Sequence, residues 1–361
     1  MSQTHQRVRL YHQVRTAHLE RAAQLPQATI VYGGKRYDFE DALARQLDLV
    51  QARGLRAALY LFRHDIDVLE VNEPLFIHAA RSTAVALLGV RARRLLGRGG
   101  PRLVTYAIEN LDPNTLPRPR SVKSQVARRL DLLLMRVIWG QLDRIVYGTR
   151  AAETLYAGLR SRQSPPATTV IEALPAAARG VDGTPKDASR VLFVGDLSDR
   201  KGFRQLMTAW PLLRQSHPQA RLTVIGKGTL HQLAEECADA DPSIQLILDP
   251  PRELIRDHLD RAQILVLPSQ PTRTWREQVG LPIVEALSYG CTVVTTTETG
   301  LAPWLAEHGH QVVGAPTSAA TLAAGLSSAL EAPLPVASVL RSLPDEDGRL
   351  AADRWLFEDH G

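Results

Sequence analysis

The chain has 361 residues, enough for two domains of ordinary size, and 44% of them are hydrophobic, as in most globular proteins. Two cysteines, Cys237 and Cys291, exclude a disulfide-stabilised fold and show no metal-ligand spacing, so we expect a cytoplasmic protein. The net charge is +5, yet residues 1–180 carry 27 basic and 15 acidic residues, and no recognised motif or aromatic pattern accompanies the arginines, which argues against nucleic-acid binding.

The first half of the sequence consists of short β-type runs separated by helical patterns. Because apolar strands alternate with helices, it predicts a parallel sheet covered on both faces, the doubly wound arrangement that binds ligands beyond the carboxyl ends of its strands. The strands are expected at residues 7–12, 28–33, 57–62, 67–72, 102–108, 143–148 and 168–173.

The alternation pauses at residues 174–189, which are rich in proline, glycine and alanine and predict a linker. We therefore expect one domain at residues 1–180 and a second, also doubly wound, at residues 190–361. Strands of the second domain are expected at 191–196, 221–226, 245–249, 263–269 and 291–296, with helices at 203–217 and 348–359.

Residues 118–144 combine basic residues with an apolar stripe. Such a helix can lie on anionic lipid, which gives the hypothesis of a peripheral membrane contact. A covering helix of a doubly wound domain has an apolar face as well, so this alternative stays open. No apolar run approaches the roughly 20 residues of a membrane span, and the first residues lack the apolar stretch of a signal peptide.

The segment GDLSDRKGF, residues 195–203, follows an expected strand and begins a helix. A helix N-terminus presents unpaired N–H groups, and Gly195 allows a ligand to approach the backbone closely. Arg200 and Lys201 add two positive charges, so the segment favours phosphate binding. A plain connection with solvated basic residues is the alternative.

The segment WREQVGLPIVEAL, residues 275–287, sets two glutamates around a turn. Gly280 ends a loop and Pro282 suits the first turn of a helix, so Glu277 lies on the loop and Glu285 within the helix. Glu285 is placed to bind ribose hydroxyls and Glu277 to bind sugar hydroxyls. Stabilisation of the helix dipole is the alternative role for Glu285.

Five segments occur in an order that resembles family 4 of the retaining glycosyltransferases, which have the two-domain GT-B fold: VLFVGDLSDRKGF, RLTVIGKGTL, RAQILVLPSQ, EQVGLPIVEALSYGCTVV and TETG. They cover most of residues 190–301. The resemblance implies two Rossmann-like domains that face a central cleft, with the C-terminal helix packing back on the first. It implies that the second domain binds a nucleotide sugar and that the first binds the acceptor.

The resemblance also assigns roles to single residues. Lys201 and Arg200 would bind the diphosphate, Glu277 the sugar and Glu285 the ribose. The backbone of Gly280, Leu281 and Pro282 would contact the sugar and diphosphate, and Lys227 and Gly228 would lie near the nucleobase. Many members have arginine directly after the glycine of the first motif, where this chain has Asp196, and Arg200 is the expected substitute.

The first half resembles the family less. It lacks the glycine-rich loop after the first strand, and its nearest glycine pair is Gly33 and Gly34. Glu109 and Asn110 stand where the family's histidine would be sought, which makes Glu109 a candidate at the reacting centre. Asn110, Asn72 and Glu73 are the candidates on the acceptor side. Each of these residues has the alternative of binding its own backbone.

The expected reaction is transfer of a sugar from a nucleotide sugar, most simply a UDP or GDP sugar, to a hydroxyl of a sugar, a lipid-linked acceptor or a small molecule. No cofactor is called for, and no Asp-x-Asp metal site accompanies the phosphate segment. Leaving-group charge would be stabilised by Arg200, Lys201 and helix termini. Two other hypotheses stay open: a non-catalytic subunit of the same fold that binds a nucleotide sugar or a partner protein, and a nucleotide-sugar epimerase.

Overall fold

A computed structural model describes residues 6–36, 38–158, 165–178 and 185–358 and divides the chain into two compact units. Unit 1 comprises Met1–Glu172 and Arg349–Gly361, and unit 2 comprises Ala173–Gly348. Of the segment expected as a linker, residues 179–184 lie outside the described residues, and its last three residues belong to strand β8 (Asp187–Val194). The last helix, α14 (Gly348–Phe357), belongs almost entirely to unit 1, as expected for a C-terminal helix that packs on the first domain.

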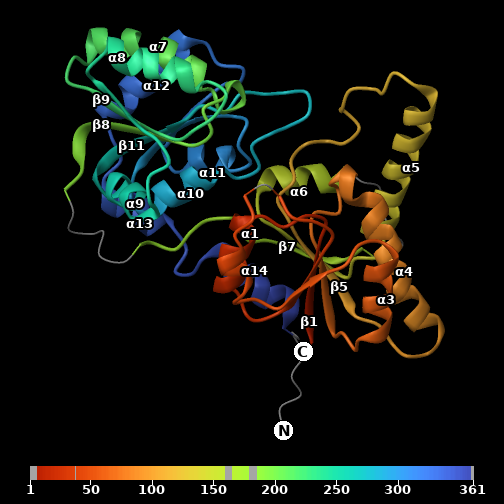
Figure 1. Ribbon diagram of the computed structural model, residues 1–361. Coiled ribbons are helices and arrows are strands. Elements are labelled where there is room, and N and C mark those ends of the chain that lie inside the picture. The colour runs from red at the N-terminus through yellow and green to blue at the C-terminus, as the bar shows by residue number, and fades with distance from the viewer. Residues whose placement is uncertain (1–5, 37, 159–164, 179–184, 359–361) are drawn as a thin grey trace. The chain divides into compact units, whose positions relative to one another are not determined.

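Unit 1 is built on a seven-stranded sheet in the order β3-β2-β1-β4-β5-β6-β7 (Figure 1). Every neighbouring pair is parallel. The strands are β1 (Arg7–Tyr11), β2 (Thr29–Tyr32), β3 (Leu49–Gln51), β4 (Val68–Val71), β5 (Arg102–Ala107), β6 (Arg144–Tyr147) and β7 (Ala167–Val170). The remaining elements are α1 (Thr16–Gln24), α2 (Asp41–Ala44), α3 (Leu55–Arg63), η1 (Ile77–Ala79), α4 (Ala80–Leu95), α5 (Val122–Trp139) and α6 (Arg150–Ala157).

The strand expected at residues 57–62 is wrong, because this segment lies inside helix α3. Its buried residues, Ala57, Ala58 and Leu61, have the spacing of one helix face, and the run of apolar residues was too short to distinguish the two periods. Gly54 precedes the helix with a φ of 57°, a conformation that glycine adopts without strain. The strand of this region is β3, which is only three residues long and was not expected.

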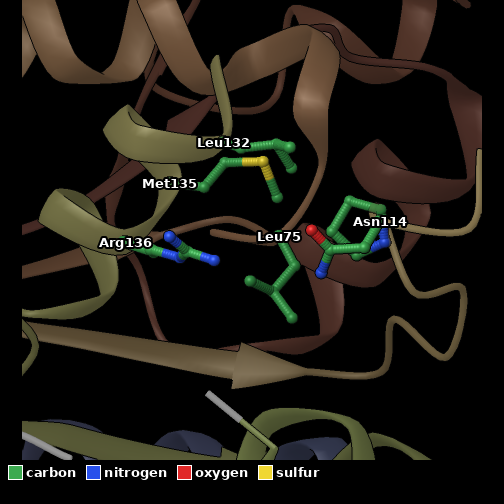
Figure 2. A pocket seen from close by; sticks show the side chains of 6 residues that line it. Leu75, Asn114, Leu132, Met135 and Arg136 are labelled. Carbon is green, nitrogen blue, oxygen red and sulfur yellow. The ribbon is translucent and has the colours of Figure 1, made fainter. Parts of the chain in front are cut away.

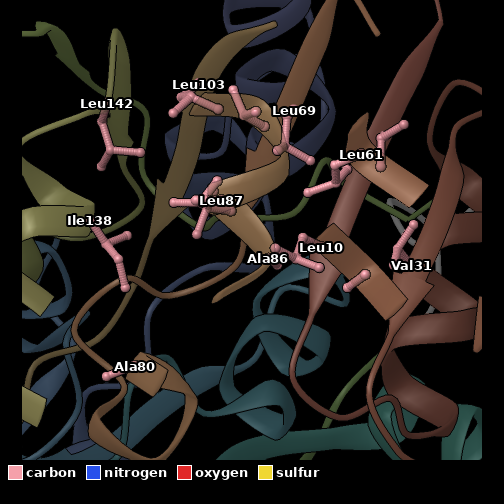
Figure 3. Packing of buried hydrophobic residues seen from close by; sticks show 14 of the residues in the cluster. Leu10, Val31, Leu61, Leu69, Ala80, Ala86, Leu87, Leu103, Ile138 and Leu142 are labelled. Carbon is pink, nitrogen blue, oxygen red and sulfur yellow. The ribbon is translucent and has the colours of Figure 1, made fainter. Parts of the chain in front are cut away.

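The larger hydrophobic cluster of unit 1 lies between its sheet and the helices α3, α4 and α5 (Figure 3), and a smaller one joins α1 to β2. Leu10 and Leu69 from neighbouring strands meet Leu61 of α3 and Leu87 of α4 in this cluster. Gly89 allows the close approach of α4 to α3, because a Cβ at this position would lie 2.0 Å from the carbonyl oxygen of Ala58.

Helix α14 is held in unit 1 by a buried network of charges. Arg9 of β1 donates to Glu70 of β4 at 3.1 Å and to Asp353 of α14 at 2.6 Å. Arg349 of α14 donates to both carboxylate oxygens of Glu70, at 2.6 and 2.9 Å. Since paired charges on two strands and one helix must all be in place, this network fixes the C-terminal segment on the first sheet.

Unit 2 has a six-stranded parallel sheet in the order β10-β9-β8-β11-β12-β13 (Figure 1). Five of its strands confirm the expected ones, namely β8, β9 (Arg221–Ile225), β10 (Ile244–Ile247), β11 (Ala262–Leu267) and β12 (Thr292–Thr296). The edge strand β13 (Gln311–Val313) was not expected. The helical elements are η3 (Asp199–Lys201), α7 (Phe203–Ser216), α8 (His231–Ala240), α9 (Arg252–Arg261), α10 (Leu281–Ser288), α11 (Ala302–Glu307), α12 (Ala319–Glu331) and α13 (Val336–Ser342).

Candidate active site

In the sheet of unit 2, β8 and β11 are neighbours from which the chain continues to opposite edges. Doubly wound folds bind ligands beyond the carboxyl ends of such a strand pair. The two segments singled out in the sequence follow these strands, since residues 195–203 come after β8 and residues 275–287 after β11. The fold therefore brings both to one edge of one sheet.

The turn after β8 approaches the end of β11 very closely. Gly202 has a φ of 71°, and a Cβ on it would lie 1.9 Å from the carbonyl oxygen of Pro268. The amide of Gln270 donates to the carbonyl of Arg200 at 2.9 Å. A glycine at position 202 is thus what allows the two loops to touch.

Lys201 and Glu277 form a buried ion pair between these loops, although 76 positions separate them in the sequence. The Lys201 Nζ atom donates to Oε2 of Glu277, and the hydroxyl of Ser269 donates to the same oxygen at 2.9 Å. Both side chains are about nine-tenths buried. The ammonium group has three donors, and the pair uses one of them, so Lys201 retains donors for an anionic ligand.

Arg200 pairs with Asp196, with 3.0 Å between Nη2 and Oδ2. Asp196, which stands where many family members have arginine, is therefore the partner of Arg200, the residue expected to replace that arginine. The ring of Trp275 lies over both cations, 4.6 Å from Cζ of Arg200 and 5.3 Å from Nζ of Lys201. Sequence reasoning missed Trp275, and its only signal was an aromatic residue two positions before Glu277.

Helix α10 begins as the sequence predicted, after Gly280 with a φ of 80° and with Pro282 in its first turn. Glu285, one turn inside the helix, pairs with Arg252 of α9 at 3.1 Å. Arg252 was not expected at the site, because nothing in the sequence links residue 252 to the motif. Leu281 at the helix start is half exposed.

The turn after β9 also lies at this edge of the sheet. A Cβ on Gly228 would lie 2.5 Å from the carbonyl oxygen of Leu197 and 2.7 Å from a carboxylate oxygen of Asp196. Lys227 pairs with Asp249 at 3.0 Å, and both side chains are about three-quarters exposed. The lysine is therefore accessible to a ligand at little energetic cost.

In unit 1, the acceptor-side candidates follow β4 and β5. Glu73 has a φ of 43°, and its carboxyl accepts from the amides of Ile108 at 2.9 Å and Glu109 at 3.3 Å. Burial, followed by the nearby Glu109 carboxylate, raises the pKa of Glu73 to about 8. The carboxyl group of Glu73 is thus largely protonated at neutral pH and connects the ends of two strands.

The carboxylate of Glu109 accepts from the amides of Asn110 at 3.0 Å and Leu111 at 2.9 Å. This is the local backbone binding that the sequence left open as an alternative. The backbone amide of Asn72 donates to the carbonyl of Leu10 at 3.2 Å, so Asn72 also lies at this edge.

His12, which directly follows β1 at the same edge, was not singled out from the sequence. Its Nδ1 atom lies 3.0 Å from the hydroxyl of Ser82. Burial, followed by the charge of Arg53, lowers the pKa of His12. Gly33 approaches this residue closely, because a Cβ there would lie 2.8 Å from the carbonyl oxygen of His12, whereas a Cβ on Gly34 would meet nothing within 4 Å.

In the part of the chain that the structure describes, no group of three or more His, Cys, Asp or Glu side chains is arranged to hold a metal ion. His308 and His310 serve other contacts. Nδ1 of His308 donates to the carbonyl of Trp304 at 2.8 Å, and Nδ1 of His310 accepts from the amide of Val293 at 3.0 Å.

Residues 176–341, nearly all of unit 2, match the family model described as glycosyl transferases group 1. Over this range, which is less than half of the chain, the protein is similar to that family. This similarity agrees with the order of motifs in the sequence and with their convergence at the ends of β8 and β11.

Two solved structures have the same fold over almost the whole chain. The crystal structure of WaaG, a glycosyltransferase involved in lipopolysaccharide biosynthesis, has a TM-score of 0.62 at 15% identity and covers 98% of this chain and 100% of that one. The structure of Anabaena HepE in complex with UDP-glucose has a TM-score of 0.58 at 14% identity and covers 98% and 96%. The GT-B fold expected from the sequence is confirmed for both Rossmann-like units.

Among curated proteins, the chain is similar to the amylovoran biosynthesis glycosyltransferase AmsK of Erwinia amylovora, with 35% identity over 124 residues. The match covers 33% of this chain and 30% of that protein. The glycogen synthase of Mycobacterium tuberculosis is 32% identical over 150 residues, which are 40% of this chain and 34% of that enzyme. The chain thus spans about a third of the length of the curated relatives that it matches.

Proposed function

We propose that the chain is a retaining glycosyltransferase that moves a sugar from a nucleotide-sugar donor to an acceptor hydroxyl, in the biosynthesis of a polysaccharide, cell-wall glycan or glycoconjugate. The observation that carries this proposal is the buried pair of Lys201 and Glu277 at the β8–β11 switch point. A cation with donors to spare beside a carboxylate suits a ligand that has both phosphates and sugar hydroxyls.

Each charged group at this edge has a role in the proposed reaction. Lys201 and Arg200 bind the diphosphate, and they stabilise the negative charge that grows on the leaving oxygen. Glu277 binds the donor sugar and orients Lys201, while Glu285 binds the ribose. The backbone of the Gly280 turn contacts the sugar and the diphosphate.

The proposed transfer occurs on the front face of the sugar. The bond between the anomeric carbon and the diphosphate oxygen breaks, and the departing phosphate accepts the proton of the acceptor hydroxyl as that oxygen bonds to the same face. No metal ion is required for this scheme, because fixed cations stabilise the leaving group. The product therefore has retained anomeric configuration, and an inverted product by NMR would contradict the scheme.

We propose a class of donor and a class of acceptor. UDP sugars come first and GDP sugars second, since the similar HepE was solved with UDP-glucose. The acceptor is a sugar, a lipid-linked molecule or a small molecule, and Asn72, Glu73, Glu109 and Asn110 of unit 1 are its candidate contacts. We place the reaction in the cytoplasm, with a peripheral contact at the inner face of the membrane.

The test is thermal unfolding of the full chain with UDP, GDP, dTDP and ADP sugars. A donor at a hundredfold excess over its dissociation constant stabilises the protein by about 2.7 kcal/mol, so one nucleotide class should raise the unfolding midpoint. Glu285→Ala should abolish that shift. The control is Glu235→Ala, which removes a surface carboxylate that pairs with His231 on α8 and should leave the shift intact.

Arg252→Ala separates two readings of a positive result. If Glu285 acts on the ligand, loss of its partner Arg252 leaves most of the shift in place, whereas equal losses in both variants would make the pair structural. If no donor raised the unfolding midpoint and no sugar were transferred to any acceptor tested, the proposed function would be overturned.

A further inference from the structure

Helix α5 of unit 1 carries an unusual concentration of exposed apolar side chains. Of the fourteen large hydrophobic residues that are exposed in the described part of the chain, five lie on this one helix. They are between 41% and 75% exposed. The five are Val122, Val126, Leu130, Leu133 and Val137.

These side chains form a single stripe, which we call the α5 stripe. Their spacing of three or four residues places them within an arc of about 80° on a helix with 100° per residue. Met135 and Ile138 lie on the opposite side and are buried in the core. A covering helix needs only the buried face, so the α5 stripe has no function in the fold of unit 1.

The first turns of α5 extend beyond the other helices of unit 1 (Figure 1). Residues 121–126 are all exposed, whereas the second half of the helix packs on the core. The stripe thus continues from the projecting half of the helix to its packed half, which gives a long surface rather than a local gap in packing.

Basic residues border the stripe. Lys123 on one side and Arg129 and Arg136 on the other lie within about 40° of its borders, by the same helical geometry. Arg118 and Arg120 precede the helix and are exposed. The described residues give these five cations no ion-pair partner, and the one acidic residue of the helix, Asp131, is paired with Arg81 at 2.6 Å.

We propose that the α5 stripe is the surface on which the chain binds an anionic lipid bilayer. The valine and leucine side chains enter the boundary between headgroups and acyl chains, and the bordering cations meet the lipid phosphates. This rests on the peripheral contact proposed above and assigns it to one face of one helix. A second copy of the chain is a poorer occupant, because two such stripes would bring their arginines together.

The contact is interfacial rather than spanning. None of the described helices is by itself long and apolar enough to cross a membrane, and one bent pair, Ala319–Glu331 with Val336–Ser342, meets the criteria of length and composition. Residues of that pair such as Leu322, Leu326 and Val339 are buried in unit 2.

The helix is joined to the loop that carries the acceptor candidates. Arg128 of α5 donates to the carbonyls of Pro117, Pro113 and Asn114 at 2.9, 3.0 and 3.1 Å. A pocket lies at the same junction, and Figure 2 shows Leu132, Met135 and Arg136 of the helix facing Leu75 and Asn114 across it. A bilayer bound at α5 would lie next to this loop, which suits the lipid-linked class among the proposed acceptors.

The experiment is co-sedimentation of the full chain with vesicles of phosphatidylcholine alone or mixed with phosphatidylglycerol. Binding should require the anionic lipid and weaken with salt. The charge variant Lys123→Gln with Arg129→Gln should lower the partition coefficient roughly 25-fold, at about fivefold per basic residue. The apolar variant Leu130→Gln with Leu133→Gln should lower it at least tenfold by the same measurement, since roughly 25 cal/mol is lost per Å² of apolar surface.

Matched controls lie on unit 2. Leu212→Gln with Leu248→Gln changes two side chains of similar exposure, and Arg221→Gln with Arg256→Gln removes two exposed charges. Only variants whose thermal unfolding midpoint equals that of the wild type are compared. If the control variants lost as much vesicle binding as the α5 variants, the assignment of the contact to α5 would be overturned.

Equal sedimentation with neutral and anionic vesicles, or none with either, would overturn the proposal altogether. So would a wild-type dimer in solution that the apolar variant converts to a monomer, because the stripe would then bind a second copy. None of these outcomes bears on donor binding, which the thermal shifts measure without lipid, so failure of this inference and failure of the proposed function are distinguishable.

Discussion

The two units have parallel sheets of the same kind, yet the carboxyl ends of their strands differ in chemistry. At the edge of unit 2, carboxylates pair with cationic side chains. Lys201–Glu277 and Arg252–Glu285 join different segments, and Arg200–Asp196 joins two residues of one segment. At the edge of unit 1, carboxyl groups instead bind backbone amides. Glu73 accepts from amides that follow the neighbouring strand β5, and Glu109 accepts from amides of its own turn.

The difference shows that a carboxylate after a parallel strand can have either of two roles, ligand binding or stabilisation of a loop. A charge paired with a side chain from a distant segment can exchange that partner for a ligand at moderate cost, whereas a carboxyl group that satisfies backbone amides is needed for the loop itself. We therefore expect substitutions in unit 2 to change ligand binding and catalysis first, and substitutions in unit 1 to change stability first.

The largest effect should follow from Lys201→Ala, which tests the comparison in unit 2. Loss of the cation should lower the transfer rate roughly 100- to 1000-fold, as for other positioned groups, and leave Glu277 buried without its partner at a cost of about 3–5 kcal/mol. Lys201→Met combined with Glu277→Gln should regain most of the stability in urea unfolding but none of the transfer rate. Recovery of both would show that Lys201 acts only through the fold.

A comparable loss of stability without a ligand effect is expected for Arg9→Ala in unit 1. Breaking the buried network with Glu70 and Asp353 should cost about 3–5 kcal/mol. Hydrogen exchange should show lower protection in peptides from β1 and β4, and unchanged protection in β8 and β11. The control, Arg7→Ala, removes a partly exposed arginine 3.7 Å from Asp353 and should cost less than about 1 kcal/mol.

An intermediate effect that depends on pH is expected for Glu73. Its pKa of about 8 lies above the ordinary value of 4.5, so the folded state binds the proton more tightly, and the stabilisation is lost as pH rises through that interval. Glu73→Gln mimics the protonated form. The free energy of unfolding in urea should therefore be larger for the variant than for the wild type. This difference should grow as pH rises, by up to about 1.4 kcal/mol per pH unit.

The difference in free energy of unfolding between Glu73→Gln and the wild type reports on Glu73 alone, because other titrating groups contribute equally to both proteins. The pKa values of His18 and His310 are lowered to about 4, chiefly by burial, and their contribution to stability rises with pH in wild type and variant alike. A difference that does not change between pH 5 and 8 would contradict the raised pKa of Glu73.

The smallest effect is expected for Asp196→Asn. Without this carboxylate Arg200 loses a competing partner, so donor affinity should rise, but by no more than about fivefold because the pair is over one-third exposed. Titration of a UDP sugar measures the change, and Asp199→Asn, which frees the exposed Arg204, is the control. Weaker donor binding in Asp196→Asn would mean that Asp196 itself contributes to the site.

The sequence predicted the parts of the fold that depend on local pattern. The apolar runs at residues 191–194 of β8 and 264–267 of β11 are continuous, as buried parallel strands require, whereas apolar residues in β1 are interrupted by Arg9. The short edge strands β3 and β13 were missed because three residues carry too little pattern. Helix α3 was predicted as a strand because its apolar run, residues 57–62, is too short to distinguish the two periods.

The candidate site divides in the same way. Lys201, Glu277 and the Gly280 turn were found from the sequence, because glycine, proline and charge at fixed spacing mark the start of a ligand-binding helix. Trp275 over the two cations, Arg252 beside Glu285 and Ser269 beside Glu277 were not found, since each depends on which loops the sheet brings together.

The sequence by itself thus determined the resemblance of its second half to a glycosyltransferase family, the two doubly wound sheets and the segments that follow their strands, because periodicity and turn chemistry are local properties. Only the tertiary structure decided which charges are paired, that the last helix is held on the first sheet by Arg9 and Glu70, and that helix α5 turns a second apolar face outward. The pairings depend on distances between residues far apart in the chain, and the outward face of α5 depends on which side of the helix packs on the core. Neither is contained in the local sequence pattern.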